Sequence, residues 1–151
     1  MSENKYYELR PAVEGDFRVI KALIRAVQIN PMGLHWQNFL MATDSQGQLI
    51  GCGQIKRHQD GSCELASIAV VEHWRRGGIA SLIINQLIDS HQGLLYLTCR
   101  STLESFYQRF GFYRITLNEM PPYFRRIDRI AGLFNKSRLI KDTLLVMKRD
   151  P

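Results

Sequence analysis

The sequence predicts an α+β fold with a mixed β-sheet, in a single domain that spans residues 1–151. Its 151 residues are 45% hydrophobic, which is enough for one domain to bury its own core. Segments typical of strands and helices follow the order β-α-β-β-β-α-β-α-β, and a further helix and strand complete the chain. No internal repeat, low-complexity segment or linker interrupts this order. We therefore expect one globular unit.

The first half of the chain predicts one helix and four strands. The alternation in "YYELRP" (6–11) favours an opening strand, and the apolar residues Phe17, Ile20, Ile24 and Val27 lie on one face of a helix. Three consecutive strands follow, separated by the turns "DSQGQ" and "HQDGS": "FLMAT" (39–43), "LIGCGQIKR" (49–57) and "CELASIAVV" (63–71). Gly51 and Gly53 within the middle strand indicate a bulge or a close backbone approach rather than a nucleotide site.

The second half predicts a longer aliphatic helix, then two more helices among strands. Ser101 and Glu104 form a Ser-x-x-Glu pattern suited to a helix N-terminus, and Gly111 is placed to end that helix. The expected helices are "IASLIINQLIDS" (79–90), the segment that begins at Ser101, and a short one in "YFRRIDRIAGLF" (123–134). The expected strands are "LLYLT" (94–98), "FYRITL" (112–117) and "DTLLVMKR" (142–149).

Composition excludes several classes of protein. The chain has no apolar run long enough to span a membrane, and its N-terminus is polar, so we expect a cytoplasmic protein without a membrane partner. The cysteines Cys52, Cys63 and Cys99 are odd in number and lack C-x-x-C spacing, which argues against a disulfide framework or a zinc site. The sequence shows no pattern of metal ligands, because the four histidines lie at no spacing typical of a metal site.

Positive charge is concentrated near the C-terminus. Residues 123–149 contain eight basic and two acidic side chains, so this segment accounts for the whole net charge of +6. Such a stripe suits nucleic acid, an acidic protein or a phosphorylated cofactor equally well. The Arg-rich part of "YFRRIDRI" either lines a substrate site or forms the solvated face of a helix.

A second basic feature lies in "VVEHWRRGGIAS" (70–81), between a predicted strand and the helix that begins at Ile79. The first N–H groups of a helix lack internal partners and carry the positive end of the helix dipole. Gly77 and Gly78 allow an anion to approach the backbone, and Arg75 and Arg76 add charge. The residues match neither the P-loop nor the dinucleotide fingerprint. A diphosphate fits this loop better than a base edge or a carboxylate.

Two motifs together resemble the GCN5-related N-acetyltransferase (GNAT) superfamily. Arg75-x-x-Gly78-x-Ala80 is similar to its pyrophosphate-binding pattern, and "FYQRFGF" (106–112) resembles its aromatic-Tyr-x-x-x-Gly-Phe segment at the expected distance. The resemblance covers most of the chain. It implies a mixed, mostly antiparallel sheet, flanked by helices and splayed between the fourth and fifth strands, with acetyl-CoA as the acetyl donor and no metal.

The resemblance also implies how acetyl-CoA is held. Backbone groups of the fourth strand, at Ile68, Ala69 and Val70, would pair with the pantetheine arm, and the N–H of Val70 would polarise the thioester carbonyl. The pyrophosphate would be held by backbone amides of Arg75, Arg76, Gly77, Gly78, Ile79 and Ala80. Arg100 occupies the place where many members have an Asn that touches the cofactor or the catalytic water.

Two residues match catalytic positions of the family. Tyr107 matches the tyrosine that protonates the leaving thiolate, and its alternative role is that of a core aromatic packed with Phe106 and Phe110. Glu64 stands where several members place a general base. Because a carboxylate is a much weaker base than an alkylamine, Glu64 would orient a water that relays the proton. Its alternative is a solvated carboxylate at a strand end.

The resulting hypothesis is an N-acetyltransferase that brings acetyl-CoA and an amine together in a ternary complex, without a covalent intermediate. The acceptor is a small molecule or a peptide or protein amine, because fold alone does not settle it. His35 and Trp36, between the first helix and the second strand, either contact the acceptor or form surface packing. One alternative is an acyl-CoA-binding regulator with little turnover, which Arg100 favours. A distant alternative is a nucleic-acid-binding module. The sequence also leaves open whether the protein forms a homodimer.

Overall fold

The structure, a computed structural model, describes residues 6–134 and 142–151 and divides into two compact units. The first comprises residues up to Lys56 together with Leu65–His91, and the second comprises Arg57–Glu64 and Gln92–Pro151. The predicted order of helices and strands is confirmed. Three residues of the basic C-terminal segment, Lys136, Arg138 and Lys141, lie outside the described residues. No helix within the described ranges is both long and apolar enough to cross a membrane.

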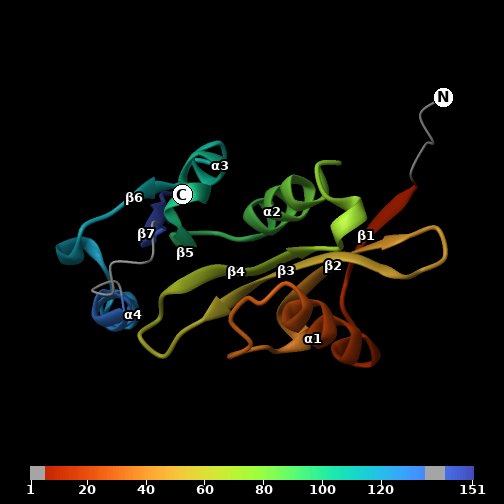
Figure 1. Cartoon of the computed structure of the whole chain (residues 1–151), viewed down its shortest axis with the longest axis horizontal. Coiled ribbons are helices and arrows are strands. Elements are labelled where there is room, and N and C mark those ends of the chain that lie inside the picture. The colour runs from red at the N-terminus through yellow and green to blue at the C-terminus, as the bar shows by residue number, and fades with distance from the viewer. Residues whose placement is uncertain (1–5, 135–141) are drawn as a thin grey trace. The chain divides into compact units, whose positions relative to one another are not determined.

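The sheet of the first unit has the strand order β1-β2-β3-β4 (Figure 1). Its strands are β1 (Tyr7–Pro11), β2 (Phe39–Asp44), β3 (Leu49–Arg57) and β4 (Cys63–Val70), the last of which begins in the second unit. Strands β1 and β2 are antiparallel, as are β2 and β3, with Leu9 opposite Ala42 and Met41 opposite Cys52. The predicted bounds of β3 are confirmed.

Helix α1 (Phe17–Ala26) covers one face of this sheet. A 3-10 turn at Glu14–Asp16 precedes the helix, and Asp16 accepts hydrogen bonds from Arg10 (2.8 Å) and from the N–H of Val13 (2.8 Å). The predicted apolar face of the helix buries Ile20 and Ile24 completely. They pack in a core with Ala12, Leu23, Phe39, Met41, Cys52 and Ala69. Two further 3-10 turns in this unit are Trp36–Asn38 and Glu72–Trp74.

Helix α2 (Ile79–Ser90) lies on the opposite face of the sheet from α1 (Figure 1). It approaches β3 where the two strand glycines lie. A Cβ atom at Gly53 would stand 2.9 Å from Cγ2 of Ile83, and one at Gly51 would stand 3.0 Å from Cγ2 of Ile79. Real carbon atoms do not pack at such distances. The sequence prediction of a close approach at these glycines is therefore confirmed. The approaching side chains come from α2 and, at Gly53, also from Ile68 of β4, whose Cδ1 would stand 2.6 Å from the added Cβ atom.

The second unit contains β5 (Leu95–Arg100), β6 (Tyr113–Arg114) and β7 (Leu144–Arg149). Strand β7 lies between the other two and is antiparallel to both, with Leu97 opposite Met147 and Tyr113 opposite Lys148. Strand β5 is parallel to the start of β4, where Tyr96 stands opposite Glu64. One parallel pairing among antiparallel ones makes the sheet mixed, as predicted. The strand expected over 112–117 has only two residues.

Two helices complete the second unit, α3 (Glu104–Gln108) and α4 (Pro122–Phe134). Helical structure starts as expected with a 3-10 turn at Ser101–Leu103, but Ser101 and Glu104 do not cap it. Ser101 donates to Asp142 (2.7 Å), and Glu104 accepts from Arg114 (2.8 Å). Gly111, with φ +89°, ends the helical segment as predicted. A 3-10 turn at Leu117–Glu119 leads to α4. The core of this unit contains Tyr96, Ile115, Met120, Phe124 and Val146.

Candidate functional site

The loop between β4 and α2 is exposed and has the backbone of an anion site. Residues Arg75 to Gly78 face solvent. Arg76 has φ +65° and Gly78 has φ +83°, both in the left-handed region. Gly78 is the N-cap of α2 and directs the chain into the helix without a side chain above the first turn. Glycine adopts this conformation without strain, which explains why the motif needs it here.

The first turn of α2 presents its N–H groups to this loop. The N–H of Leu82 donates to the carbonyl of Gly78 (3.1 Å), which is the first hydrogen bond of the helix. The N–H groups of Ile79, Ala80 and Ser81 come before it in the chain and have no carbonyl of the helix to donate to. Such groups, with the positive end of the helix dipole, favour an anion. Ile79 is buried against the sheet, whereas Arg76 is exposed. The predicted loop residues are thus brought together at one helix end.

The side chain of Arg75, although the residue is exposed, is hydrogen-bonded back to β4. Its Nε atom donates to the carbonyl of Val70 (3.1 Å). Val71 donates its N–H to Ile50 of β3 (2.8 Å). Since backbone groups alternate in direction along a strand, those of Val70 point to the side away from β3. By the same alternation, the backbone groups of Ile68 also point away from β3, and those of Ala69 point toward β3.

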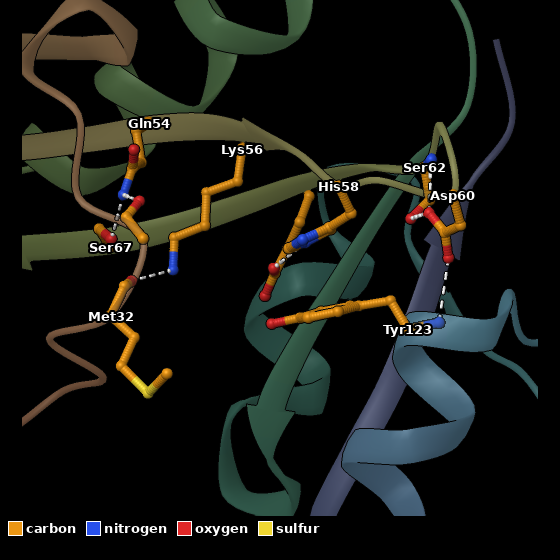
Figure 2. A network of polar contacts seen from close by, with 10 residues as sticks. Met32, Gln54, Lys56, His58, Asp60, Ser62, Ser67 and Tyr123 are labelled. Atoms are coloured by element: carbon orange, nitrogen blue, oxygen red, sulfur yellow. Dashed lines mark hydrogen bonds and ion pairs between the residues drawn. The ribbon is translucent and has the colours of Figure 1, made fainter.

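An unpredicted feature of β4 is the backbone at Ser67, where φ is +59°. A residue other than glycine is rare in this conformation inside a strand, and the surrounding contacts must hold it there. The Ser67 hydroxyl accepts a hydrogen bond from Nε2 of Gln54 (2.8 Å; Figure 2). Gln54 is fully buried, and its Oε1 atom has no hydrogen-bond partner within the described ranges. Ser67 directly precedes Ile68, so this contact helps to set the conformation of the predicted cofactor strand.

Tyr107 lies on α3 and is partly buried. Its ring packs edge-on against Phe106, at 5.0 Å between ring centroids, and against Phe112, at 6.3 Å. Burial, with a smaller contribution from Cys99, raises the pKa of Tyr107 to about 12. The phenol therefore stays protonated at neutral pH and can donate a proton or a hydrogen bond. Aromatic packing and an acid role are compatible in this position.

Glu64 is a buried carboxylate and not a solvated strand end. Its Oε2 atom lies 2.7 Å from Nε2 of His58, and the side chain of Glu64 is 7% exposed. The His58 ring stacks on Tyr123, with centroids 3.5 Å apart and planes inclined by 16°. Figure 2 shows Tyr123 lying flat beside His58. Sequence reasoning missed both partners. The spacing of His58 and Glu64 across the turn "HQDGS" could have indicated this pair.

The structure also shows the state of the cysteines and the arrangement of possible metal ligands. Within residues 6–134 and 142–151, no group of three or more His, Cys, Asp or Glu side chains could hold a metal ion. All three cysteines are free. Burial raises the pKa of Cys52 to about 12 and that of Cys99 to about 11, the latter with a smaller effect of Glu104. Both are buried and behave as small apolar residues. Cys63 is partly exposed.

Comparison with known proteins agrees with this fold. The sequence matches the family described as the acetyltransferase (GNAT) domain over residues 35–114, which is more than half of the chain. This chain belongs to the GNAT acetyltransferase family. An uncharacterized N-acetyltransferase of Chlorobaculum tepidum is 29% identical over 89 residues, which are 58% of this chain and 57% of that protein. The chain therefore matches little more than half of its curated relative.

Solved structures of similar fold include proteins with bound coenzyme A. N-acetylglutamate synthase from Neisseria gonorrhoeae, in complex with coenzyme A and N-acetyl-glutamate, has a TM-score of 0.71 at 23% identity, over 98% of this chain and 36% of that one. Rv2747 from Mycobacterium tuberculosis, in complex with CoA and NLQ, has a TM-score of 0.69 at 20% identity, over 95% and 99%. ElaA of Escherichia coli has a TM-score of 0.69 at 15% identity, over 96% and 100%. At these identities the likeness establishes the fold.

Proposed function

We propose that this protein is an acetyl-CoA-dependent N-acetyltransferase that transfers the acetyl group directly to an amine in a ternary complex. The observation that carries the proposal is the exposed loop Arg75–Gly78 at the N-terminus of α2, in a chain of the GNAT family. Its free N–H groups and its left-handed Gly78 suit a pyrophosphate. The solved relatives with bound coenzyme A support the same donor.

The donor would be bound through the backbone of β4 and the loop. The residues proposed for this role are Ile68, Val70, Arg75, Arg76, Gly77, Gly78, Ile79 and Ala80. Ala69 is not among them, because its backbone lies on the β3 side of the strand. Val70 directs its N–H away from β3 and would polarise the thioester carbonyl, which gains negative charge when the amine attacks. Arg75, bonded to the Val70 carbonyl (3.1 Å), would then position this strand end, and the exposed Arg76 would face the anion.

Two residues of the second unit would carry the proton transfers. Tyr107 would protonate the leaving thiolate of coenzyme A, and its pKa of about 12 keeps the phenol in the acid form at neutral pH. Glu64 would assist removal of a proton from the acceptor ammonium through a water. Its hydrogen bond with His58 (2.7 Å) fixes the orientation of the carboxylate, so His58 would act as a positioning residue.

A matched pair of glycine variants tests the donor site. Gly78 and Gly47 both have a positive φ, +83° and +76°, and a Cβ atom at either would meet nothing within 4 Å. Gly78→Ala and Gly47→Ala should therefore cost similar stability, about 1–2 kcal/mol, from backbone strain. Only Gly78→Ala should weaken acetyl-CoA binding, by about tenfold, the equivalent of one lost hydrogen bond. Calorimetric titration with acetyl-CoA measures the affinity of each variant. Equal affinities for the two variants would contradict this placement of the pyrophosphate.

Turnover is tested by thiol release from acetyl-CoA with a panel of amines. We expect release that depends on the amine. Binding of acetyl-CoA without such release would instead indicate an acyl-CoA-binding regulator, the alternative that Arg100 favoured in the sequence. Arg100 is exposed at the end of β5, where a positive side chain remains available to a phosphate or carboxylate.

A further inference from the structure

A small cavity lies in the second unit next to the His58–Glu64 pair. Its volume is about 260 Å³, and its walls are formed by His58, Gln59, Asp60, Pro122, Tyr123 and Arg126. At about 30 Å³ for each water molecule in the liquid, this volume corresponds to roughly nine waters. A cavity of this size accepts a small organic group. The proposed donor site does not include this cavity, and two of its residues, Tyr123 and Arg126, come from the Arg-rich segment for which the sequence left a substrate-site role open.

Contacts on two sides hold the walls of the cavity in place. His58 is bonded to the buried Glu64 (2.7 Å) and stacks on Tyr123 at 3.5 Å. The N–H of Tyr123, in the first turn of α4, donates to Asp60 in the turn between β3 and β4 (3.0 Å; Figure 2). Phe124 packs edge-on against both rings. Because these side chains are already fixed, a ligand would lose little free energy in ordering them.

Two hydrogen-bond donors in the cavity wall are available to a ligand: the Arg126 guanidinium and the Tyr123 hydroxyl. Asp60 already accepts from the N–H of Ser62 (2.9 Å), from its hydroxyl (2.6 Å) and from Tyr123. Arg126 is exposed, and no carboxylate in the described part of the chain pairs with it. Burial, and then Glu64, raises the pKa of Tyr123, so its hydroxyl remains a donor at neutral pH. That hydroxyl has no hydrogen-bond partner among the described residues.

We propose that this cavity binds a carboxylate group of the acceptor, so that the acceptor is an amino acid or a similarly small amine with a carboxylate. The guanidinium of Arg126 can pair with both carboxylate oxygens, and the Tyr123 hydroxyl can donate to one of them. The cavity wall contains one cation, Arg126, and one anion, Asp60, so a singly charged carboxylate is repelled less by Asp60 than a doubly charged phosphate. This inference rests on the proposed N-acetyltransferase function and adds the substrate class.

The test compares amino acids with their carboxamides as acceptors: glycine with glycinamide, and L-phenylalanine with L-phenylalaninamide. The variants are Arg126→Gln, Tyr123→Phe and, as a matched control, Arg125→Gln, since Arg125 is also exposed on α4 but does not line the cavity. Arg126→Gln should raise KM for the amino acids by about 10- to 100-fold and leave KM for the carboxamides within about twofold. Tyr123→Phe should act in the same direction with a smaller effect, and Arg125→Gln should match the wild type.

A binding measurement separates this inference from the proposed function. Calorimetric titration of the protein with CoA present, using N-acetylglycine and N-acetylglycinamide as probes, should show tighter binding of the carboxylate and loss of that preference in Arg126→Gln. If no amine is acetylated but this preference is found, the proposed function fails and the carboxylate site stands. If acids and amides behave alike in both measurements, or if Arg125→Gln has the same effect as Arg126→Gln, the carboxylate site is wrong.

Discussion

Replacing Gly53 with alanine is expected to destabilise the protein by about 1–3 kcal/mol, the usual range for an overpacked core. The added Cβ atom would lie 2.6 Å from Cδ1 of Ile68, 2.9 Å from Cγ2 of Ile83 and 3.2 Å from Cδ1 of Leu87. Carbon atoms pack best at about 3.5–4.0 Å. The Ile68 contact is therefore too short by about 0.9 Å, and the Ile83 contact by about 0.6 Å.

The two short contacts would be relieved in different ways. Cδ1 of Ile68 is the end of a flexible side chain and can rotate away. Cγ2 of Ile83 is attached to the branched Cβ atom, so it can retreat only if the side chain leaves its preferred rotamer or if α2 moves. The expected loss of stability therefore arises mainly where α2 packs on β3. Such a shift would also displace the N-terminus of α2, where we propose that the pyrophosphate of acetyl-CoA binds.

Urea unfolding and thermal melting measure the effect. Each kcal/mol should lower Tm by about 2–4 °C for a chain of this size. Gly15→Ala is the control, because a Cβ atom there meets nothing within 4 Å, and it should change stability by less than about 0.5 kcal/mol. Ile83→Ala removes Cγ2, so Gly53→Ala combined with Ile83→Ala should lose at least about 0.5 kcal/mol less than the sum of the single changes. Additive losses, or a Gly53→Ala protein as stable as the wild type, would refute the packing argument.

Three further predictions concern titratable side chains. Tyr107→Phe should lower kcat by about 10²- to 10⁴-fold, the usual contribution of a positioned acid, whereas an unchanged kcat would leave only a packing role. The pKa of Tyr107 in the folded protein, about 12, exceeds the value of about 10 for an unfolded chain. Its contribution to stability is therefore complete below pH 10 and is lost as pH rises toward 12, and Tyr107→Phe should reduce this alkaline loss in urea unfolding. With iodoacetamide at pH 8, Cys63 should react in the native protein, whereas Cys52 and Cys99, which are buried, should react only after unfolding. Mass spectrometry of the labelled peptides shows which cysteine has reacted. Labelling of Cys52 in the native protein would contradict its burial.

Local patterns in the sequence predicted much of the fold and the donor loop. Strand β3 was predicted from its residue pattern and bounding turns, and α2 begins at Ile79, directly after the glycines. These features depend on neighbours in the chain. The Ser101–Glu104 cap failed for the opposite reason, because Asp142 and Arg114 offered those side chains stronger partners from distant segments.

The stacking of Tyr123 on the His58 ring, next to Glu64, could not be predicted for a similar reason. The turn "HQDGS" places His58 near Glu64, but Tyr123 reaches His58 only because α4 packs there in the folded chain. The positive φ of Ser67 likewise depends on Gln54, a residue of the neighbouring strand. Nothing in the residues around Ser67 indicates that conformation.

The sequence by itself determined the order of the elements, the close approach at Gly51 and Gly53, and the family, because periodicity, glycine placement and short motifs are local properties of the chain. Only the tertiary structure decided the burial of Glu64, the direction of the Arg75 side chain, and the cavity beside Arg126. Those properties depend on which distant side chains meet, and they arise from packing that no single segment encodes.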